Sequence, residues 1–239
     1  MKTEQRLAEI FVELADTLVA EFDALDFLGT LTERSVELLH ADAAGVILSD
    51  QHGRLQVVAS TSNRAQDLEL FELQSEEGPC LDCFNNGHVV ANVDLAEAQA
   101  RWPRFSAASL ELGYQSTHAV PLRLRDQVIG AMNLFCTDQR ELSRDDLALA
   151  QALADVATIG LLQERAVREA DLLAEQLQTA LNSRVLIEQA KGVMMAKSGV
   201  DVDEAFRRMR DHSRKNQLAL RDVAASILDG TLAPERMSP

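Results

Sequence analysis

The chain of 239 residues has little cysteine, few aromatic residues and no long apolar run. Its three cysteines, Cys80, Cys83 and Cys136, are too few for a disulfide framework and are typical of a reducing compartment. No run of about 18 apolar residues occurs, so no membrane-spanning helix is expected. The first residues also lack the apolar core and cleavage site of a secretion signal. The expected location is therefore the cytoplasm, away from the membrane.

Sequence patterns that carry catalysis are also missing. The chain has no G-x-S-x-G nucleophile turn, no H-E-x-x-H zinc helix and no glycine-rich phosphate loop. Without a nucleophile, a base and an anion-binding group at a recognisable spacing, an enzyme is not expected. The hydrophobic content of 46% is enough for a packed core, and the length allows one large domain or two small ones.

Basic residues are fewer than acidic ones, and they are unevenly distributed. The formal net charge of −15 argues against general affinity for nucleic acid. Residues 191–215, however, hold seven Lys and Arg residues against four Asp and Glu, a local charge of +3. Because salt screens charges beyond about 8–10 Å, this patch acts largely independently of the acidic remainder.

Residues 181–229 predict three short amphipathic helices, because their apolar residues repeat at the i, i+3, i+4, i+7 spacing of one buried stripe. The predicted core positions are Leu186, Ala190, Val193, Met194, Val202, Ala205, Phe206, Met209, Ser213, Leu220, Val223, Ala224, Ile227 and Leu228. Gly199 marks the end of the first helix. Asp201 and Glu204 fit an N-cap and its reciprocal partner. Phe206, the only aromatic residue after Phe135, is expected to anchor this core.

This segment resembles an ANTAR domain over all three helices. The matching stretches are IEQAKGVMMAK at 187–197, DEAF at 203–206 and DVA at 222–224, together with Arg210, Ser213 and Asn216. The resemblance implies a module that binds paired hairpins in nascent RNA and causes antitermination of transcription. The residues then expected to contact RNA are Arg184, Lys191, Lys197, Arg207, Arg208, Arg210, Arg214, Lys215 and Asn216.

Charge at helical spacing alone has simpler interpretations. Basic side chains more often form a solvated helix face than a binding surface, and Arg210 fits equally well an ion pair with Asp222. A DNA-binding helix-turn-helix is another alternative, although the third helix, with Arg221 and Asp222, offers only one base and one acid to a major groove. A further alternative is a ligand or redox sensor whose output is protein–protein contact only.

Residues 1–146 predict an α+β domain with an antiparallel sheet. Two amphipathic helices are followed by a hairpin at 44–60, where the apolar period changes from helical to extended. A variable middle part contains the breakers Gly78 and Pro79. A second hairpin joins 116–124 to 127–136. This order of elements predicts one sandwich of sheet and helices.

This half resembles a GAF domain. The matching stretches are GPC at 78–80, AVPL at 119–122 and VIGAMNL at 128–134. GAF domains hold a small ligand between the sheet and the middle loops, or act as dimerising scaffolds without one. The resemblance therefore implies a sensor half with or without a small-molecule ligand, and the sequence indicates no particular cofactor.

Four residues are candidates for a ligand pocket in this half: Cys80, Cys83, Trp102 and His118. The C-x-x-C of Cys80 and Cys83 fits a redox pair, two metal ligands with His88 nearby, or two small buried side chains one helical turn apart. No second C-x-x-C or H-x-x-H completes a four-ligand zinc site, so no metal is predicted. Trp102 fits a pocket wall or a packed helix start, and His118 fits a core or pocket-edge position.

Residues 147–180 predict one long connecting helix. Ser143 and Asp146 fit the cap at its start, and its apolar residues, among them Leu173, Leu177 and Leu181, follow an imperfect heptad. A long helix with one apolar side usually pairs with a second copy, so a parallel homodimer is expected. Packing of its first turns against the first helices of the same chain is the alternative.

The predicted organisation has three parts. A GAF-like α+β domain (1–146) is joined by a coiled-coil-like helix (147–180) to an all-α three-helix ANTAR-like domain (181–239). The expected function is that of a cytoplasmic, dimeric, one-component regulator in which the first part senses a signal and the last part binds RNA.

Overall fold

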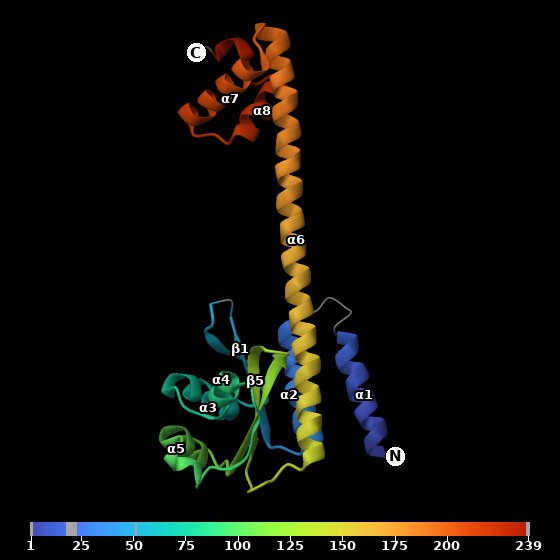
Figure 1. Cartoon of the computed structure of the whole chain (residues 1–239), viewed down its shortest axis with the longest axis vertical. Helices are drawn as coiled ribbons and strands as arrows, with labels where there is room; N and C mark the ends of the chain where they lie inside the picture. The colour runs from blue at the N-terminus through green and yellow to red at the C-terminus, as the bar shows by residue number, and fades with distance from the viewer. Residues whose placement is uncertain (1, 18–22, 51, 238–239) are drawn as a thin grey trace. The chain divides into compact units, whose positions relative to one another are not determined.

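The computed structural model of the chain describes residues 2–17, 23–50 and 52–237. Two compact units divide the chain, Met1–Arg165 and Ala166–Pro239. The division falls inside a single helix, α6 (Arg144–Ser198), which contributes residues to both units (Figure 1).

The first unit is built on a five-stranded antiparallel sheet with the order β2-β1-β5-β4-β3. The strands are β1 (Ala43–Ser49), β2 (Leu55–Ser60), β3 (Val90–Asp94), β4 (Ser116–Leu124) and β5 (Gln127–Cys136). Both predicted hairpins are confirmed, β1 with β2 and β4 with β5. The central strand β5 is buried from Ile129 to its end, because helices cover both faces of the sheet.

Helices α1 (Lys2–Thr17) and α2 (Ala24–Leu39), with the first turns of α6, pack on one face of this sheet. The other face is covered by α3 (Asn63–Ser75), α4 (Pro79–Asn86), the short helix η1 (Ala98–Ala100) and α5 (Pro103–Glu111). Alternate residues of each strand therefore enter different cores: Val120 and Met132 lie on the α2 side, and Ala119 and Ala131 on the α4 side. The predicted α+β sandwich is confirmed.

Helix α6 starts at the predicted cap and runs without a break to Ser198. The Ser143 hydroxyl donates to Asp146 Oδ2 over 2.7 Å, and the Asp146 N–H donates back to Ser143 Oγ over 3.2 Å. Leu153 and Ala157 are buried in the first unit, so intramolecular packing accounts for the first turns of the helix. Among the helices in the described residues, none is long and apolar enough to cross a membrane.

The second unit packs the end of α6 against α7 (Val202–Asn216) and α8 (Leu220–Leu228). Gly199, at φ +65°, ends α6 as predicted, and its N–H donates to Met195 O over 3.0 Å. Asp201 caps α7, since its Oδ1 accepts the Glu204 N–H over 2.8 Å. The predicted reciprocal contact, from the Glu204 carboxylate back to Asp201, is wrong, because this carboxylate pairs with Arg207 and Arg208 instead. The buried core consists of Ala190, Met194, Ala205, Met209, Val223, Ala224, Ile227 and Met237.

The prediction that Phe206 anchors this core is wrong. Its side chain is 36% exposed, and Val202 on the same helix is 42% exposed. The core contains the small side chains of Ala190, Ala205 and Ala224, one from each of the three helices. Phe206 follows Ala205 by one residue, and one residue rotates the side chain by about 100° around the helix, toward the surface.

The close contact of β5 with β1 gives a stability prediction. A Cβ added at Gly130 would lie 2.2 Å from the backbone oxygen of Ile47, whereas one added at Gly29 in α2 would meet nothing within 4 Å. We expect Gly130→Ala to lower the free energy of unfolding by about 3 kcal/mol. Gly29→Ala, the control in the same unit, should raise it by roughly 0.5–1 kcal/mol. Urea denaturation measures both, and equal effects would contradict the strand contact.

Candidate functional site

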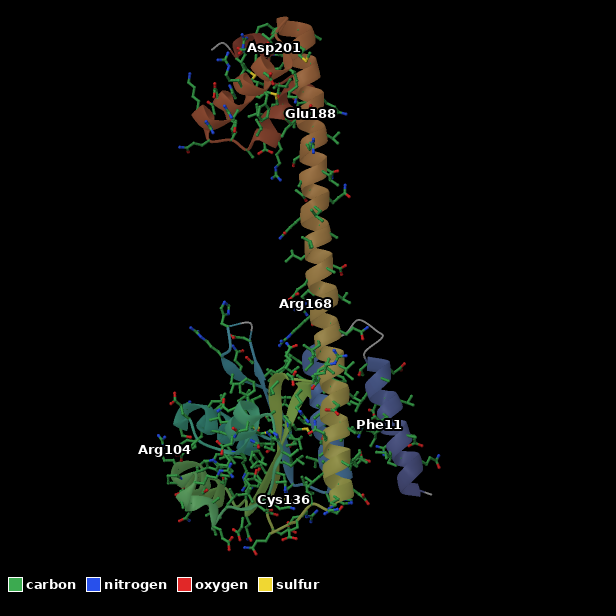
Figure 2. All side chains as sticks on the ribbon, viewed as in Figure 1. Phe11, Arg104, Cys136, Arg168, Glu188 and Asp201 are labelled. Atoms are coloured by element: carbon green, nitrogen blue, oxygen red, sulfur yellow. The ribbon has the colours of Figure 1, made fainter. Side chains whose placement is uncertain are left out.

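The residues expected to contact RNA lie on α6 and α7 of the second unit. Side chains of this unit are drawn in Figure 2, where Glu188 of α6 and Asp201 at the start of α7 are labelled. Two of the expected residues, Lys191 and Arg208, are half-buried. The remainder are exposed, namely Arg184, Lys197, Arg207, Arg210, Arg214, Lys215 and Asn216.

Ion pairs separate these basic residues into two groups. Lys191 pairs with Glu188 over 2.7 Å, and Glu204 pairs with both Arg207 and Arg208. In the described part of the chain, no ion pair is formed by the remaining five, Arg184, Lys197, Arg210, Arg214 and Lys215. The cations available to an external anion therefore include three in the second half of α7.

Arg210 does not form the predicted alternative pair with Asp222, whose carboxylate contacts its neighbour Arg221 over 3.3 Å. Arg210 and Arg214 are one helical turn apart and so share one face of α7. Arg214 and Lys215 also occupy the last turn of the helix, where positive charge interacts favourably with the helix dipole. This face is thus compatible with a folded helix in the absence of any ligand.

An aromatic surface lies beside the basic residues. The Lys191 ammonium is 5.7 Å from the centroid of the Phe206 ring, within the range of a cation–π contact. Because this ring is partly exposed, it presents an apolar flat surface next to a positive charge. The sequence interpretation missed this feature because the apolar spacing placed Phe206 in the core.

The middle of α6 carries an exposed apolar stripe. Every residue from 166 to 182 is exposed. Leu173, Leu177 and Leu181 are 56–58% exposed and follow one another at intervals of four residues. This is the segment in which the sequence predicts a dimer seam.

In the first unit, the predicted pocket residues Cys80 and Cys83 are fully buried in α4 and are free thiols. Burial raises the pKa of Cys80 well above its usual range and that of Cys83 to about 12. A thiolate is the reactive form of cysteine, so these side chains are poorly suited to a redox pair in this conformation.

Trp102 belongs to a different apolar cluster from the two cysteines, although it contacts the same helix, α4. Trp102 caps the start of α5, and its indole N–H donates to Asp82 Oδ2 over 3.2 Å. His118 accepts a hydrogen bond at Nδ1 from the Asn92 N–H over 2.9 Å. It shares the face of β4 that carries Val120, opposite the face against which Cys80 packs. The structure therefore does not bring the four predicted residues together.

A buried polar group that the sequence interpretation missed lies between α3, α4 and β5. We call it the buried acidic cluster: Glu69, Glu72, Cys80 and Asn133, all without exposed surface. Glu72 accepts hydrogen bonds from the Asn133 amide over 2.9 Å and from the Leu81 N–H over 3.0 Å. Neither carboxylate oxygen of Glu69 has a hydrogen-bond partner among the described residues.

Burial raises the pKa of both carboxyl groups in the buried acidic cluster. For Glu69, burial and then the charge of Glu72 raise the pKa well above its usual range. For Glu72, burial raises the pKa to about 8, although the Leu81 N–H and Asn133 act in the opposite direction. The signal in the sequence was the helical spacing of Ala65, Glu69 and Glu72, which places both carboxylates on the buried face of α3.

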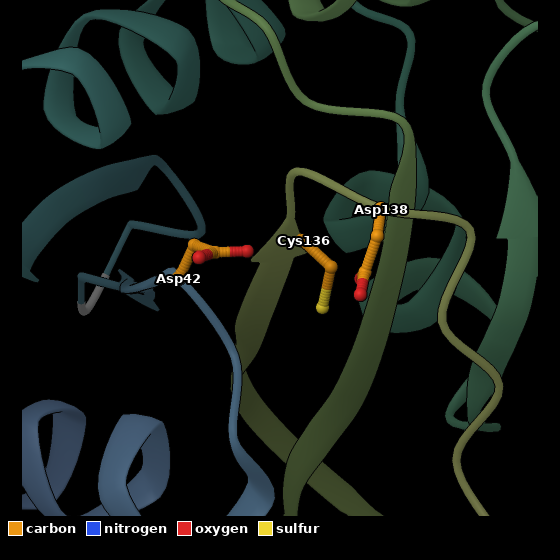
Figure 3. A group of neighbouring side chains, drawn as sticks. All are labelled: Asp42, Cys136 and Asp138. Carbon is orange, nitrogen blue, oxygen red and sulfur yellow. The ribbon is translucent and has the colours of Figure 1, made fainter.

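A second group of possible ligands, Asp42, Cys136 and Asp138, surrounds the end of β5 (Figure 3). Here the carboxylates already have partners. Asp42 accepts from the Thr137 N–H over 2.7 Å, and Asp138 pairs with Arg140 over 3.1 Å. Both aspartates are also exposed, so solvent and protein satisfy this group without an added ligand.

His118 gives a prediction for acid stability. Burial, with the charge of Arg140, lowers its pKa from 6.5 to about 4. Protonation of Nδ1 would also break the bond with the Asn92 N–H. The unfolded chain therefore binds the proton more tightly. Above pH 6.5, His118 does not lower the free energy of unfolding. As the pH falls from 6.5 toward 4, His118 lowers this free energy progressively. At about 1.4 kcal/mol per tenfold difference in proton affinity, the loss approaches ~3 kcal/mol.

The variant His118→Asn retains a hydrogen-bond acceptor but does not titrate. We expect it to unfold with a shallower pH dependence between pH 6.5 and 4 than the unchanged chain, as measured by urea denaturation at each pH. Parallel curves for the two proteins would show that His118 is not the group responsible.

Comparisons with known proteins find one domain family in each of the two compact units of the chain. The GAF domain family model matches residues 23–162, and the ANTAR domain family model matches residues 175–228. No curated protein matched the chain.

Solved structures that resemble the chain include the GAF domain from a phosphoenolpyruvate-protein phosphotransferase of Coxiella burnetii (16% identity, TM-score 0.53, covering 68% of this chain and 96% of that one). The GAF domain of the corresponding Acinetobacter protein has 12% identity and a TM-score of 0.52, covering 67% of this chain and 95% of that one. A GAF domain/HD domain protein from Geobacter sulfurreducens has 21% identity and a TM-score of 0.50, covering 60% and 95%. At these identities the similarity concerns the fold alone.

Proposed function

Because the chain belongs to the GAF domain family and carries an ANTAR domain after it, we propose that it is a regulator that binds paired hairpins in nascent RNA and causes transcription antitermination. The observation that carries the proposal is the unpaired basic face of α7 in a domain of the ANTAR family. Neither domain family is catalytic, and the proposed function requires no chemical step.

The contacts that we propose follow from the side chains available on this surface. Arg210 and Arg214 have planar guanidinium groups, which bind phosphate in a two-point geometry and stack on unpaired bases. The exposed part of the Phe206 ring is suited to stacking by a loop base, and Lys191 beside it could bind a nearby phosphate on release of its pair with Glu188. Hairpin loops supply both groups, whereas paired stems supply mainly phosphate.

Antitermination would follow from a difference in affinity. An antiterminator hairpin and a terminator hairpin compete for overlapping RNA, so a protein that binds the first more tightly shifts the balance by that difference in free energy. Such a protein acts where transcripts are made, in the cytoplasm. A major-groove reader is less well supported, because the basic residue of α8, Arg221, is paired with Asp222.

Two hairpins presented together would be bound best by two ANTAR domains. We propose that two chains pair along the exposed stripe of Leu173, Leu177 and Leu181 on α6. A segment in which every residue from 166 to 182 is exposed has no apolar burial of its own to stabilise it. Pairing with a second copy buries the stripe in a coiled-coil seam. Linking two weak sites in this way raises overall affinity by roughly 10²–10⁴-fold.

The first test concerns RNA contact. The double variant Arg210→Ala with Arg214→Ala should weaken binding to a hairpin RNA. The slope of log affinity against log salt should become shallower by roughly 1.4–1.8, since each of the two lost phosphate contacts removes about 0.7–0.9. Gel-shift titration at several salt concentrations measures both quantities.

The matched control is Arg123→Ala with Arg125→Ala, which makes the same change in net charge on exposed residues of the first unit. It should leave affinity and slope nearly unchanged. Equal losses in the two double variants would mean that total charge, rather than the face of α7, governs binding.

The second test concerns the dimer. Leu173→Asp with Leu177→Asp should produce a monomer, because two carboxylates cannot be buried in an apolar seam without large cost. Binding to a two-hairpin RNA should fall by roughly 10²–10⁴-fold, while binding to one hairpin changes little. Light scattering and gel-shift titration provide the measurements.

The control places the same charges on the opposite side of the helix, as Thr179→Asp with Asn182→Asp, and should remain dimeric. A leucine variant that stays dimeric, or an unchanged chain that is monomeric and still binds two hairpins tightly, would refute the seam.

A further inference from the structure

The buried acidic cluster has hydrogen-bond acceptors without donors. Both carboxylate oxygens of Glu69 and the Oδ1 atom of Asn133 are buried and form no hydrogen bond of ordinary geometry among the described residues, although the nearby Asn133 amide acts to lower the pKa of Glu69. No Lys or Arg side chain of the described chain forms an ion pair with Glu69 or Glu72, and the charges that act on them are other acids. Burying such groups without compensation is costly, so the cluster has the electrostatics of a site for a cation.

Two glycines provide the space for these carboxylates. A Cβ at Gly45 of β1 would lie 2.5 Å from Glu69 Oε1, and one at Gly78 would lie 2.5 Å from the Glu72 carboxyl group. Any other residue at either position would displace the acid that lies against it. The backbone on two sides of the cluster is therefore shaped around the two carboxyl groups.

The fourth member contributes an independent observation. Asn133 lies on β5, in the centre of the sheet, and donates through Nδ2 to Glu72 Oε2. Its carbonyl oxygen has no donor although the side chain is fully buried. Rotation of the amide, at the loss of its bond to Glu72, would present this oxygen to the carboxyl groups as a further ligand for a cation.

A thiol adds a third metal ligand to the two carboxyl groups. One ligand atom from each of Glu69, Glu72 and Cys80 lies within 4.8 Å of the others. In a tetrahedral zinc site with bonds of about 2.0–2.3 Å, neighbouring ligand atoms are roughly 3–4 Å apart. Side-chain movements that shift these atoms by about 1 Å would thus bring the three atoms to coordination distance.

We infer that the buried acidic cluster binds one divalent transition-metal ion of the zinc type, held by Glu69, Glu72 and the Cys80 thiolate, with the Asn133 carbonyl oxygen as the fourth ligand. Carboxylate and thiolate together are a donor set that Zn²⁺ accepts and that Mg²⁺ and Ca²⁺, which prefer oxygen alone, do not. The two carboxylates and the thiolate carry a charge of −3, so one divalent ion leaves a net charge of −1. Protons held by these three groups pass to the solvent on binding.

The proposed site extends beyond the predicted C-x-x-C. Of the two cysteines, Cys80 alone has its sulfur within 4.8 Å of ligand atoms of Glu69 and Glu72, while Cys83, equally buried one turn later, is not part of this group. The other ligands come from α3 and β5. An ion at this position would join α3, α4 and the central strand of the sheet, so its presence or absence would alter the order of the middle segment of the sensor half.

The experiment uses the full chain, freed of metal by a chelator and then titrated with Zn²⁺ or Co²⁺. Because the ligands are buried, each ion is supplied both to the folded chain and during refolding. We expect saturation at one ion per chain, a rise in Tm of several degrees with bound Zn²⁺, and a thiolate-to-cobalt charge-transfer absorption in the Co²⁺ complex. Absence of saturable binding by both routes, or a saturated Co²⁺ complex without this absorption, overturns the inference.

Matched variants identify the ligands. Glu69→Gln keeps the side-chain volume, removes the unpartnered carboxylate and supplies an amide donor, so it should raise Tm in the absence of metal while weakening Zn²⁺ binding at least tenfold. Cys80→Ser should weaken binding and abolish the cobalt absorption, and Cys83→Ser should leave both unchanged. Equal effects of the two serine variants, or Zn²⁺ affinity unchanged in Glu69→Gln, would refute the assignment. If Cys80→Ser does not fold, the absorption of the unchanged chain and the glutamine variant still decide.

Discussion

The organisation of the molecule depends on the continuous hydrogen-bonded backbone of α6. The first turns of this helix supply Leu153 and Ala157 to the core of the first unit, and its last turns supply Ala190 and Met194 to the core of the second. Neither core is complete without its part of α6. The two domain families that match the chain therefore share one helix, whose buried residues lie on either side of the exposed segment 166–182.

The two units stabilise their cores by different means. In the first, helices cover both faces of the sheet, and the central strand β5 approaches β1 so closely that Gly130 has no room for a side chain. In the second, the core consists mainly of alanine and methionine residues around three short helices. A small core of this kind leaves larger side chains such as Phe206 at the surface, where they are available to a partner.

Local patterns in the sequence predicted turns, caps and helix ends correctly where these features depend on a few neighbouring residues. Three such features are confirmed: the hairpin of β4 and β5, the cap at Ser143 and the helix end at Gly199. Phe206 was placed wrongly because periodicity shows which side of a helix is apolar but not how wide the buried strip is. Glu69 and Glu72 were missed because their burial depends on Gly45 and Gly78, residues outside the helix that carries them.

The exposure of residues 166–182 has a consequence for the stability of the connection itself. In a single chain this segment buries no residue in either core, and most of the stability of a helix in a protein comes from such packing. Its amide hydrogens would then exchange with solvent much faster than those of the two cores, because local opening there needs no core residue to leave its place. In a single chain, this segment of α6 would open locally and often. Pairing with a second copy would suppress this opening, so the rigidity of the segment would be a property of the dimer.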